Sequence, residues 1–148
     1  TVEPLATSCL QLAADLDLDF LLLDTEAGLP PSTLAALTAA NTALLVLALD
    51  KQHSQAPART VAVIDQLPLT RRMMVVNLVS PSLLPDNVQA QVTQSYGWDV
   101  AAMAPYCEEL GALGSASLFA LRYPTHPVTA ILRQVAQGLV RGGQELLR

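Results

Sequence analysis

Three apolar runs without polar alternation constrain the fold of this chain more than any other feature of its sequence. They are DFLLLD (19–24), TALLVLALD (42–50) and RMMVVNLV (72–79). Strands that are covered on both faces have this character, and parallel strands need long crossover connections that are usually helical. The runs therefore predict an α/β fold with a mainly parallel, doubly wound sheet and helices on both faces.

The stretches between these runs predict the helices. Leu5, Cys9, Leu12 and Leu16 share one helical face, and Pro127 suits the first position of a last helix. The expected elements are helix 4–16, strand 19–24, helix 31–41, strand 42–50, helix 56–67, strand 72–79, helix 86–97, strand 98–105, helix 107–114, a strand or extended segment at 117–121, and a helix from 127.

Length, composition and charge limit the class of protein. The chain has 148 residues, of which 51% are hydrophobic and 14% are charged, as expected of one globular domain over 1–148. The net charge of −5 gives no support to a DNA-binding or membrane-binding surface. Cys9 and Cys107 form no metal-binding or disulfide pattern. Without an apolar run long enough to span a bilayer, we expect a cytoplasmic protein.

Polar residues and a proline follow the predicted strands. Asp24, Asp50, Asn77 and Pro105 fall at or just past their carboxyl ends, where ligands bind in open parallel sheets. Asp24 could hold Mg²⁺, and Gly28 could let its N–H approach a phosphate because it has no side chain. The simpler alternative is a polar strand end followed by a turn.

Four segments, in order, resemble the ParA/MinD family of P-loop ATPases with a deviant Walker A motif. DFLLLDTEAGL is similar to the family's "yDyiiiDtpaGl", and AANTALLVLALD to its next strand. MMVVNLV resembles the family's "vvvNr" strand. VAAMAPYCEELGALGSASLFALRYPTHPVTAIL resembles its C-terminal end, where an "iPyd" turn leads to the last helices. The resemblance covers nearly the whole chain and implies a P-loop NTPase-like fold.

The resemblance implies roles for five residues. Asp24 matches the Walker B aspartate near Mg²⁺, and Gly28 matches the glycine that senses the γ-phosphate. Asn77 matches the asparagine that reads the adenine edge. Pro105 and Tyr106 match the turn that packs beside the adenine ring. ATP and Mg²⁺ are therefore the implied cofactors.

Several features depart from the family pattern. Glu26 replaces a proline or small residue, and Leu78 stands where many members carry arginine. The phosphate-binding glycine-rich loop with its lysine is absent, and the one lysine, Lys51, lies in no such loop. In the family this loop precedes the segment that matches residue 1. We therefore expect this chain to be the C-terminal part of a longer ATPase domain, and to be inactive alone.

The implied function is an ATPase that works as a homodimer, hydrolyses ATP slowly and positions DNA, division machinery or other cargo. Two alternatives remain open. One is a pseudo-ATPase scaffold without hydrolysis, and the other is a metal-centre maturation ATPase of the same superfamily. We expect His53 and His126 to be surface or capping residues, and Glu108 and Glu109 to begin a solvated helix.

Overall fold

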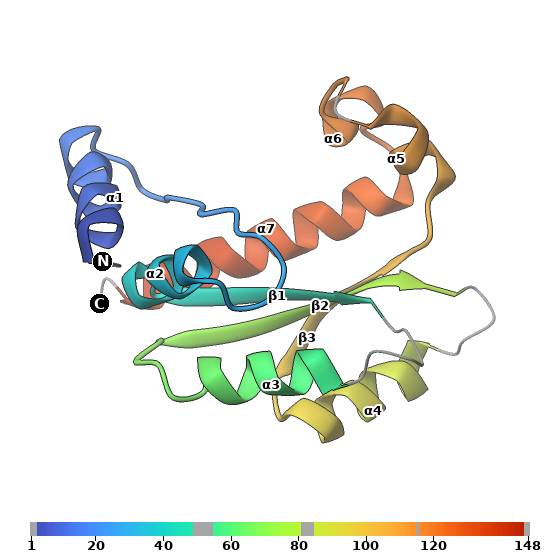
Figure 1. The fold of residues 1–148 in the computed structure, drawn as a ribbon. Helices are drawn as coiled ribbons and strands as arrows, with labels where there is room; N and C mark the ends of the chain where they lie inside the picture. Colours follow the sequence, from blue (N-terminus) through green and yellow to red (C-terminus); the bar gives the residue numbers. More distant parts are fainter. Residues whose placement is uncertain (1–2, 49–54, 81–84, 115, 147–148) are drawn as a thin grey trace. The chain divides into compact units, whose positions relative to one another are not determined.

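A computed structural model gives the structure and describes residues 3–48, 55–80, 85–114 and 116–146. In this part of the chain helices flank a parallel sheet, so the fold is α/β (Figure 1). The described elements are α1 (Glu3–Asp15), α2 (Pro31–Ala39), β1 (Thr42–Ala48), α3 (Gln55–Ile64), β2 (Arg71–Val79), α4 (Pro85–Tyr96), β3 (Asp99–Pro105), α5 (Glu108–Leu113), α6 (Phe119–Arg122) and α7 (Pro127–Leu146).

The chain divides into two compact units. Unit 1 comprises Thr1–Ala43 and His53–Arg71, and unit 2 comprises Leu44–Gln52 and Arg72–Arg148. Unit 1 contains α1, α2 and α3, and α1 contacts α2. Unit 2 contains nearly all of the sheet and the four later helices. No helix among the described residues has the length and apolar character needed to cross a bilayer.

The sheet has three parallel strands in the order β1-β2-β3. Residues 42–48, 71–79 and 99–105 form these strands, which confirms the strands predicted near 42–50, 72–79 and 98–105. Met73 aligns with Asp99 at the start of the β2–β3 pair, and Val79 aligns with Pro105 at its end. The carboxyl ends of β2 and β3 therefore lie side by side. The predicted strand-end residue Asp50 falls outside the described residues.

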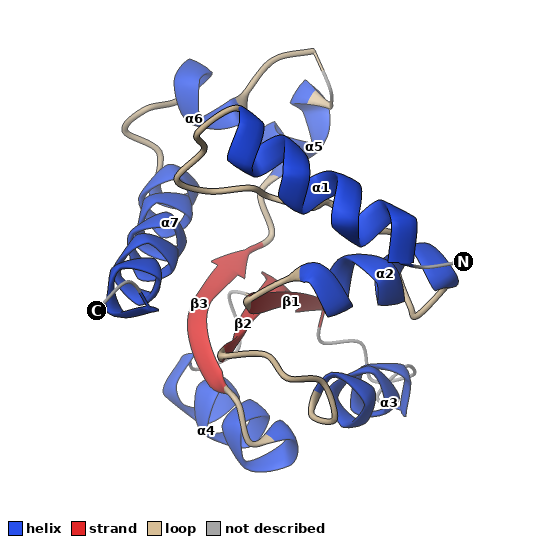
Figure 2. Cartoon of the chain, turned by 90° about the vertical axis from the view of Figure 1, so that its left-hand side faces the viewer, coloured by secondary structure: helices blue, strands red, loops and turns tan. Residues whose placement is uncertain are grey.

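The core of unit 2 forms between the sheet and α7. Val75, Ala102 and Val135 are buried together, and two half-buried residues of α7, Ile131 and Leu139, pack against them. On the other side of the sheet lies α4, so that β3 runs between α4 and α7 (Figure 2). Alternate side chains of β2 serve both faces, which explains its unbroken apolar sequence.

The first strand, β1, is buried on one face only. Ala43 and Leu47 are buried, whereas Leu44 and Val46 are 37% and 57% exposed. The prediction that this strand is covered on both faces is therefore wrong. β1 stands at the edge of the three-stranded sheet, and only one face of its apolar run is buried.

Residues 20–24 form no strand, and this corrects the sequence prediction. They belong to an irregular segment between α1 and α2, in which Phe20 is 49% exposed and Leu22 is 81% exposed. A strand requires a hydrogen-bonded neighbour, and none of the described residues pairs with this segment. Asp24 therefore does not stand at the carboxyl end of a strand.

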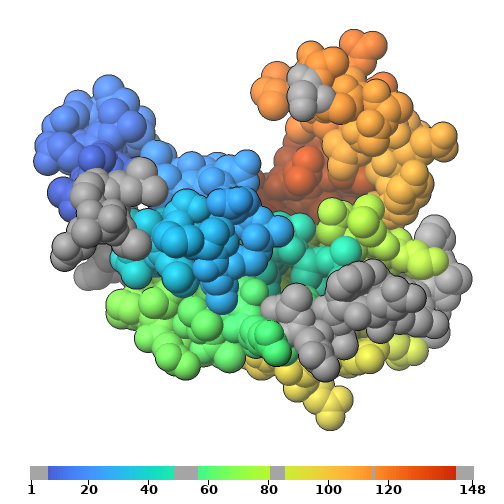
Figure 3. Space-filling view, viewed as in Figure 1, coloured from blue at the N-terminus to red at the C-terminus, as the bar shows by residue number. Residues whose placement is uncertain are grey.

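The segment 117–121 also differs from its prediction. Phe119–Arg122 forms the short helix α6, and the Tyr123 N–H donates to the Phe119 carbonyl at 2.8 Å. Phe119 is buried and stacks at a tilt on Tyr123, while Leu118 and Leu121 are exposed. Burial of the Phe119 ring therefore favours a helical turn in this segment. In Figure 3 the surface of α5 and α6, in orange, adjoins the red surface of α7.

The helix ends agree well with the sequence signals. Gly97 follows α4 with a φ of 74°, and its N–H donates to the Thr93 carbonyl at 2.8 Å. This left-handed position after a helix favours glycine. The last helix, α7, begins at Pro127 as predicted and continues through Gly142 and Gly143 to Leu146.

Candidate functional site

The carboxyl end of β2 is distorted at Asn77 and Leu78. Leu78 has a φ of 56°, a left-handed conformation that is unfavourable for a leucine. The Asn77 Oδ1 atom accepts a hydrogen bond from the Leu78 N–H at 2.9 Å. The pairing with β3 shifts register between Val76 and Val79, so a bulge turns the backbone here. The half-buried Asn77 side chain thus stabilises the turn in which it lies.

Pro105 and Tyr106 leave β3 directly beside this bulge. The Tyr106 N–H donates to the Val79 carbonyl at 3.4 Å, which extends the contact of the two strands by one residue. The Tyr106 side chain is 66% exposed, and Pro105 is exposed as well. The structure therefore brings together three of the predicted site residues, Asn77, Pro105 and Tyr106, at one edge of the sheet.

Asp24 and Gly28 lie on the irregular segment that precedes α2. Both are exposed, and Gly28 has a φ of 87° with open space where a Cβ atom would lie. Backbone conformation, and not lack of room, is what favours glycine at this position. The two residues share a segment of unit 1, while the other three predicted site residues belong to unit 2.

Glu26 anchors this segment to α2. Its Oε1 atom accepts a hydrogen bond from the Ser32 hydroxyl at 2.9 Å, and its carbonyl accepts one from the Thr33 hydroxyl at 3.3 Å. Thr33 is buried in the first turn of α2. The acid that departs from the family pattern therefore has a structural role, because it holds the segment that carries Asp24 and Gly28.

The residues present fit Mg²⁺ and ATP in part. Asp24 offers one exposed carboxylate, and Mg²⁺ is commonly bound by one or two carboxylates with water and phosphate oxygens. Asn77 offers an amide at the end of β2, and Tyr106, just after β3, offers an exposed ring. The phosphates would need cationic and backbone N–H partners, but the one lysine of the chain, Lys51, falls outside the described residues.

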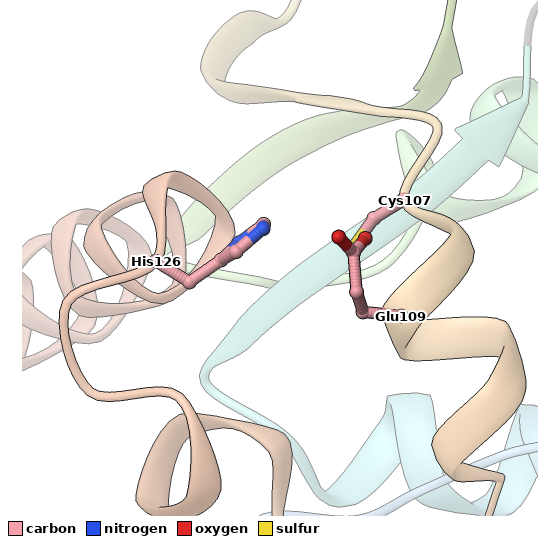
Figure 4. Close-up of side chains that lie close together, drawn as sticks. All are labelled: Cys107, Glu109 and His126. Atoms are coloured by element: carbon pink, nitrogen blue, oxygen red, sulfur yellow. The ribbon is translucent and has the colours of Figure 1, made fainter.

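Sequence reasoning missed a cluster of Cys107, Glu109 and His126. One possible metal-ligand atom of each residue lies within 4.8 Å of the others, and the side chains point toward one another (Figure 4). Cys107 and Glu109 stand at the start of α5, and His126 directly precedes α7. No local motif could have revealed this group, because the histidine is distant in sequence from the other two residues.

Each side chain of this cluster takes part in a hydrogen bond. The Cys107 thiol donates to the Glu109 Oε2 atom at 3.3 Å. The backbone N–H of Glu109, then the Cys107 thiol and to a smaller degree His126, hold the pKa of the Glu109 carboxyl below its usual value. The His126 Nδ1 atom accepts from the Val128 N–H at 3.1 Å, which confirms its predicted capping role.

In comparisons with protein-family models, curated proteins and solved structures, none matches this chain. The sequence of the chain and the geometry of its own residues are therefore the basis for assigning a function.

Proposed function

We propose that this chain supplies the base-binding part of an ATP site in a ParA/MinD-like ATPase with a doubly wound, P-loop NTPase-like fold. One observation carries the proposal. The Tyr106 N–H bonds to the Val79 carbonyl, and this contact brings the Asn77–Leu78 bulge beside the Pro105–Tyr106 turn. Ligands of open parallel sheets bind outside such strand ends. The ordered sequence resemblance suggests adenine as the group bound there.

The chemistry of these side chains suits an adenine ring. The Asn77 Oδ1 atom already accepts from the Leu78 N–H, but an amide oxygen has a second lone pair and the amide NH₂ can donate. The exposed Tyr106 ring offers an apolar face, and stacking of a base on an aromatic ring contributes about 1–3 kcal/mol. Pro105 adds apolar surface without a competing N–H group.

The sequence resemblance assigns roles near Mg²⁺ and the γ-phosphate to Asp24 and Gly28, which belong to unit 1. Mg²⁺, when bound, neutralises charge on the phosphates, and Asp24 is the residue that would hold it. Glu26 keeps the segment of Asp24 attached to α2 through Ser32 and Thr33. The working protein is then a cytoplasmic homodimer that hydrolyses ATP slowly and positions DNA, division machinery or another cargo.

One observation favours a second candidate, a scaffold that keeps the fold without hydrolysis. The Asn77 oxygen accepts a hydrogen bond from the backbone of its own turn. This bond also suits a protein that binds no nucleotide at this end of the sheet.

Steady-state ATPase kinetics on the full natural polypeptide separate these candidates. We predict that Asp24→Asn impairs Mg²⁺-dependent turnover while the fold is kept, because the amide has nearly the same size but no charge. Asn77→Ala should raise KM more than it lowers kcat, because the base is remote from the reacting phosphate. Asp19→Asn is the matched control, since Asp19 is another exposed aspartate in the same connection.

The kinetic pattern can contradict the proposal in two ways. If the wild-type polypeptide shows no Mg²⁺-dependent ATPase activity, the scaffold is the better account. If Asp24→Asn hydrolyses ATP at the wild-type rate, the carboxylate is only a polar loop residue, and the assigned role of Asp24 is wrong.

A further inference from the structure

The cluster of Cys107, Glu109 and His126 has a composition that points to a particular class of ligand. It combines a sulfur, an oxygen and an imidazole nitrogen, all within 4.8 Å of one another. Zn²⁺ is bound by these three ligand types, whereas Mg²⁺ and Ca²⁺ prefer oxygen alone. The three residues come from two segments, so the fold and not a local motif brings them together.

The distances in the cluster are close to those of a metal site. Zinc bonds of about 2.0–2.3 Å in a tetrahedron place neighbouring ligand atoms roughly 3.3–3.7 Å apart. The Cys107 Sγ and Glu109 Oε2 atoms are already 3.3 Å apart. The other separations, at most 4.8 Å, need to shorten by about one ångström, which side-chain rotations can provide.

Neighbouring contacts hold the histidine in place. The His126 ring lies at a near right angle to that of the buried Phe119 with ring centroids 5.2 Å apart, and the His126 backbone N–H donates to the Tyr123 carbonyl at 3.2 Å. On the other side of the cluster, at the start of α5, the Cys107 thiol donates a hydrogen bond to the Glu109 carboxylate. Both sides of the cluster are therefore oriented before any ion arrives.

From this juxtaposition we infer that Cys107, Glu109 and His126 bind one Zn²⁺ ion per chain, with a fourth position open to water. Cys107 binds as the thiolate and its proton passes to solvent. A neutral imidazole has one nitrogen with a free lone pair, and in His126 this is Nδ1, which now accepts from the Val128 N–H. The ion therefore binds Nδ1 in place of that hydrogen bond, or binds Nε2 after the ring proton has moved to Nδ1. The inference does not rest on the proposed ATP site, although Cys107 directly follows Tyr106 in the chain.

Titration with Co²⁺ tests the inference, because cobalt replaces zinc and reports its ligands in the absorption spectrum. We predict one equivalent of Co²⁺ per chain, with a thiolate-to-cobalt charge-transfer band and the visible bands of a tetrahedral ion. Zn²⁺ should displace the cobalt and remove both signals. Glu109→Gln and His126→Asn should each weaken Co²⁺ binding by at least about tenfold, and Cys107→Ser should abolish the charge-transfer band.

Matched controls separate ligation from structural damage. Asn is a good helix cap, so His126→Asn keeps an acceptor for the Val128 N–H while it removes the imidazole. Glu108→Gln changes a neighbouring exposed acid, and Cys9→Ser removes the other thiol; both should bind Co²⁺ as the wild type does. Circular dichroism should show equal helix content in all variants.

Two results would overturn the inference. One is the absence of a thiolate-to-cobalt band in the wild-type chain. The other is an unchanged band and affinity in both Glu109→Gln and His126→Asn, since the thiol would then bind the ion alone. In either case the cluster is only a hydrogen-bonded pair beside a helix-capping histidine.

Discussion

Leu78 carries the least favourable backbone conformation near the candidate site. Its φ of 56° brings the Cβ of a leucine close to the neighbouring carbonyl, which costs about 1–2 kcal/mol. The side chain is 52% exposed, so burial offsets only part of this cost. The Asn77 side chain compensates by bonding to the Leu78 N–H. Strain of this kind is common where backbone must turn away from a sheet at a binding site.

Substitutions at Leu78 test whether the strain is real. We predict that Leu78→Gly is more stable than Leu78→Ala by about 1 kcal/mol, because only glycine adopts this conformation freely. At an ordinary position the order is reversed, so the sign of the difference is informative. Urea unfolding followed by fluorescence of the buried Trp98 measures it. An alanine variant as stable as the glycine variant contradicts the assigned conformation.

The elements show which sequence signals were reliable. The runs that begin at residues 42 and 72 form the strands 42–48 and 71–79, and the helix predicted over 86–97 is α4. The run at 19–24 fails because apolar character predicts burial, but pairing depends on a neighbour that lies elsewhere in the chain. The run at 117–121 fails because a short apolar stretch fits a strand and a helical turn equally well, and burial of Phe119 decides for the turn.

The contact between α7 and the sheet allows a prediction of stability. Val135 is 9% exposed and packs with Val75 and Ala102, so Val135→Ala should lower the free energy of unfolding by roughly 1–3 kcal/mol. Leu132 lies on the same helix and is 46% exposed, so Leu132→Ala should change it by less than about 0.5 kcal/mol. Urea denaturation of both variants checks the difference. Equal effects would mean that α7 does not pack on the sheet through Val135.

For the molecule as a whole, the sequence predicted the positions of some candidate residues better than those of others. Asn77, Pro105 and Tyr106 lie at or just past the carboxyl ends of neighbouring parallel strands, as expected. Asp24 lies on an irregular segment of unit 1, since the strand that was to position it does not form. The cluster around His126 was beyond prediction, because only the fold brings the start of α5 close to the residue before α7.

The candidate residues set the affinity that we expect this chain to have for nucleotides. The residues at the ends of β2 and β3 can recognise a base, but the sequence supplies no glycine-rich loop for phosphates. Affinity for Mg-ATP should therefore be close to that for adenosine and on the order of millimolar. Tight binding would mean that the phosphates find partners that the account does not identify.

A nuclear magnetic resonance titration of the ¹⁵N-labelled chain tests the central claim most directly. We predict that adenosine shifts the amide signals of Leu78 and Tyr106, that guanosine shifts them much less, and that Asn77→Ala removes the difference. Equal responses to the two nucleosides, or an adenosine response confined to other parts of the chain, would contradict a base-binding site at the ends of β2 and β3.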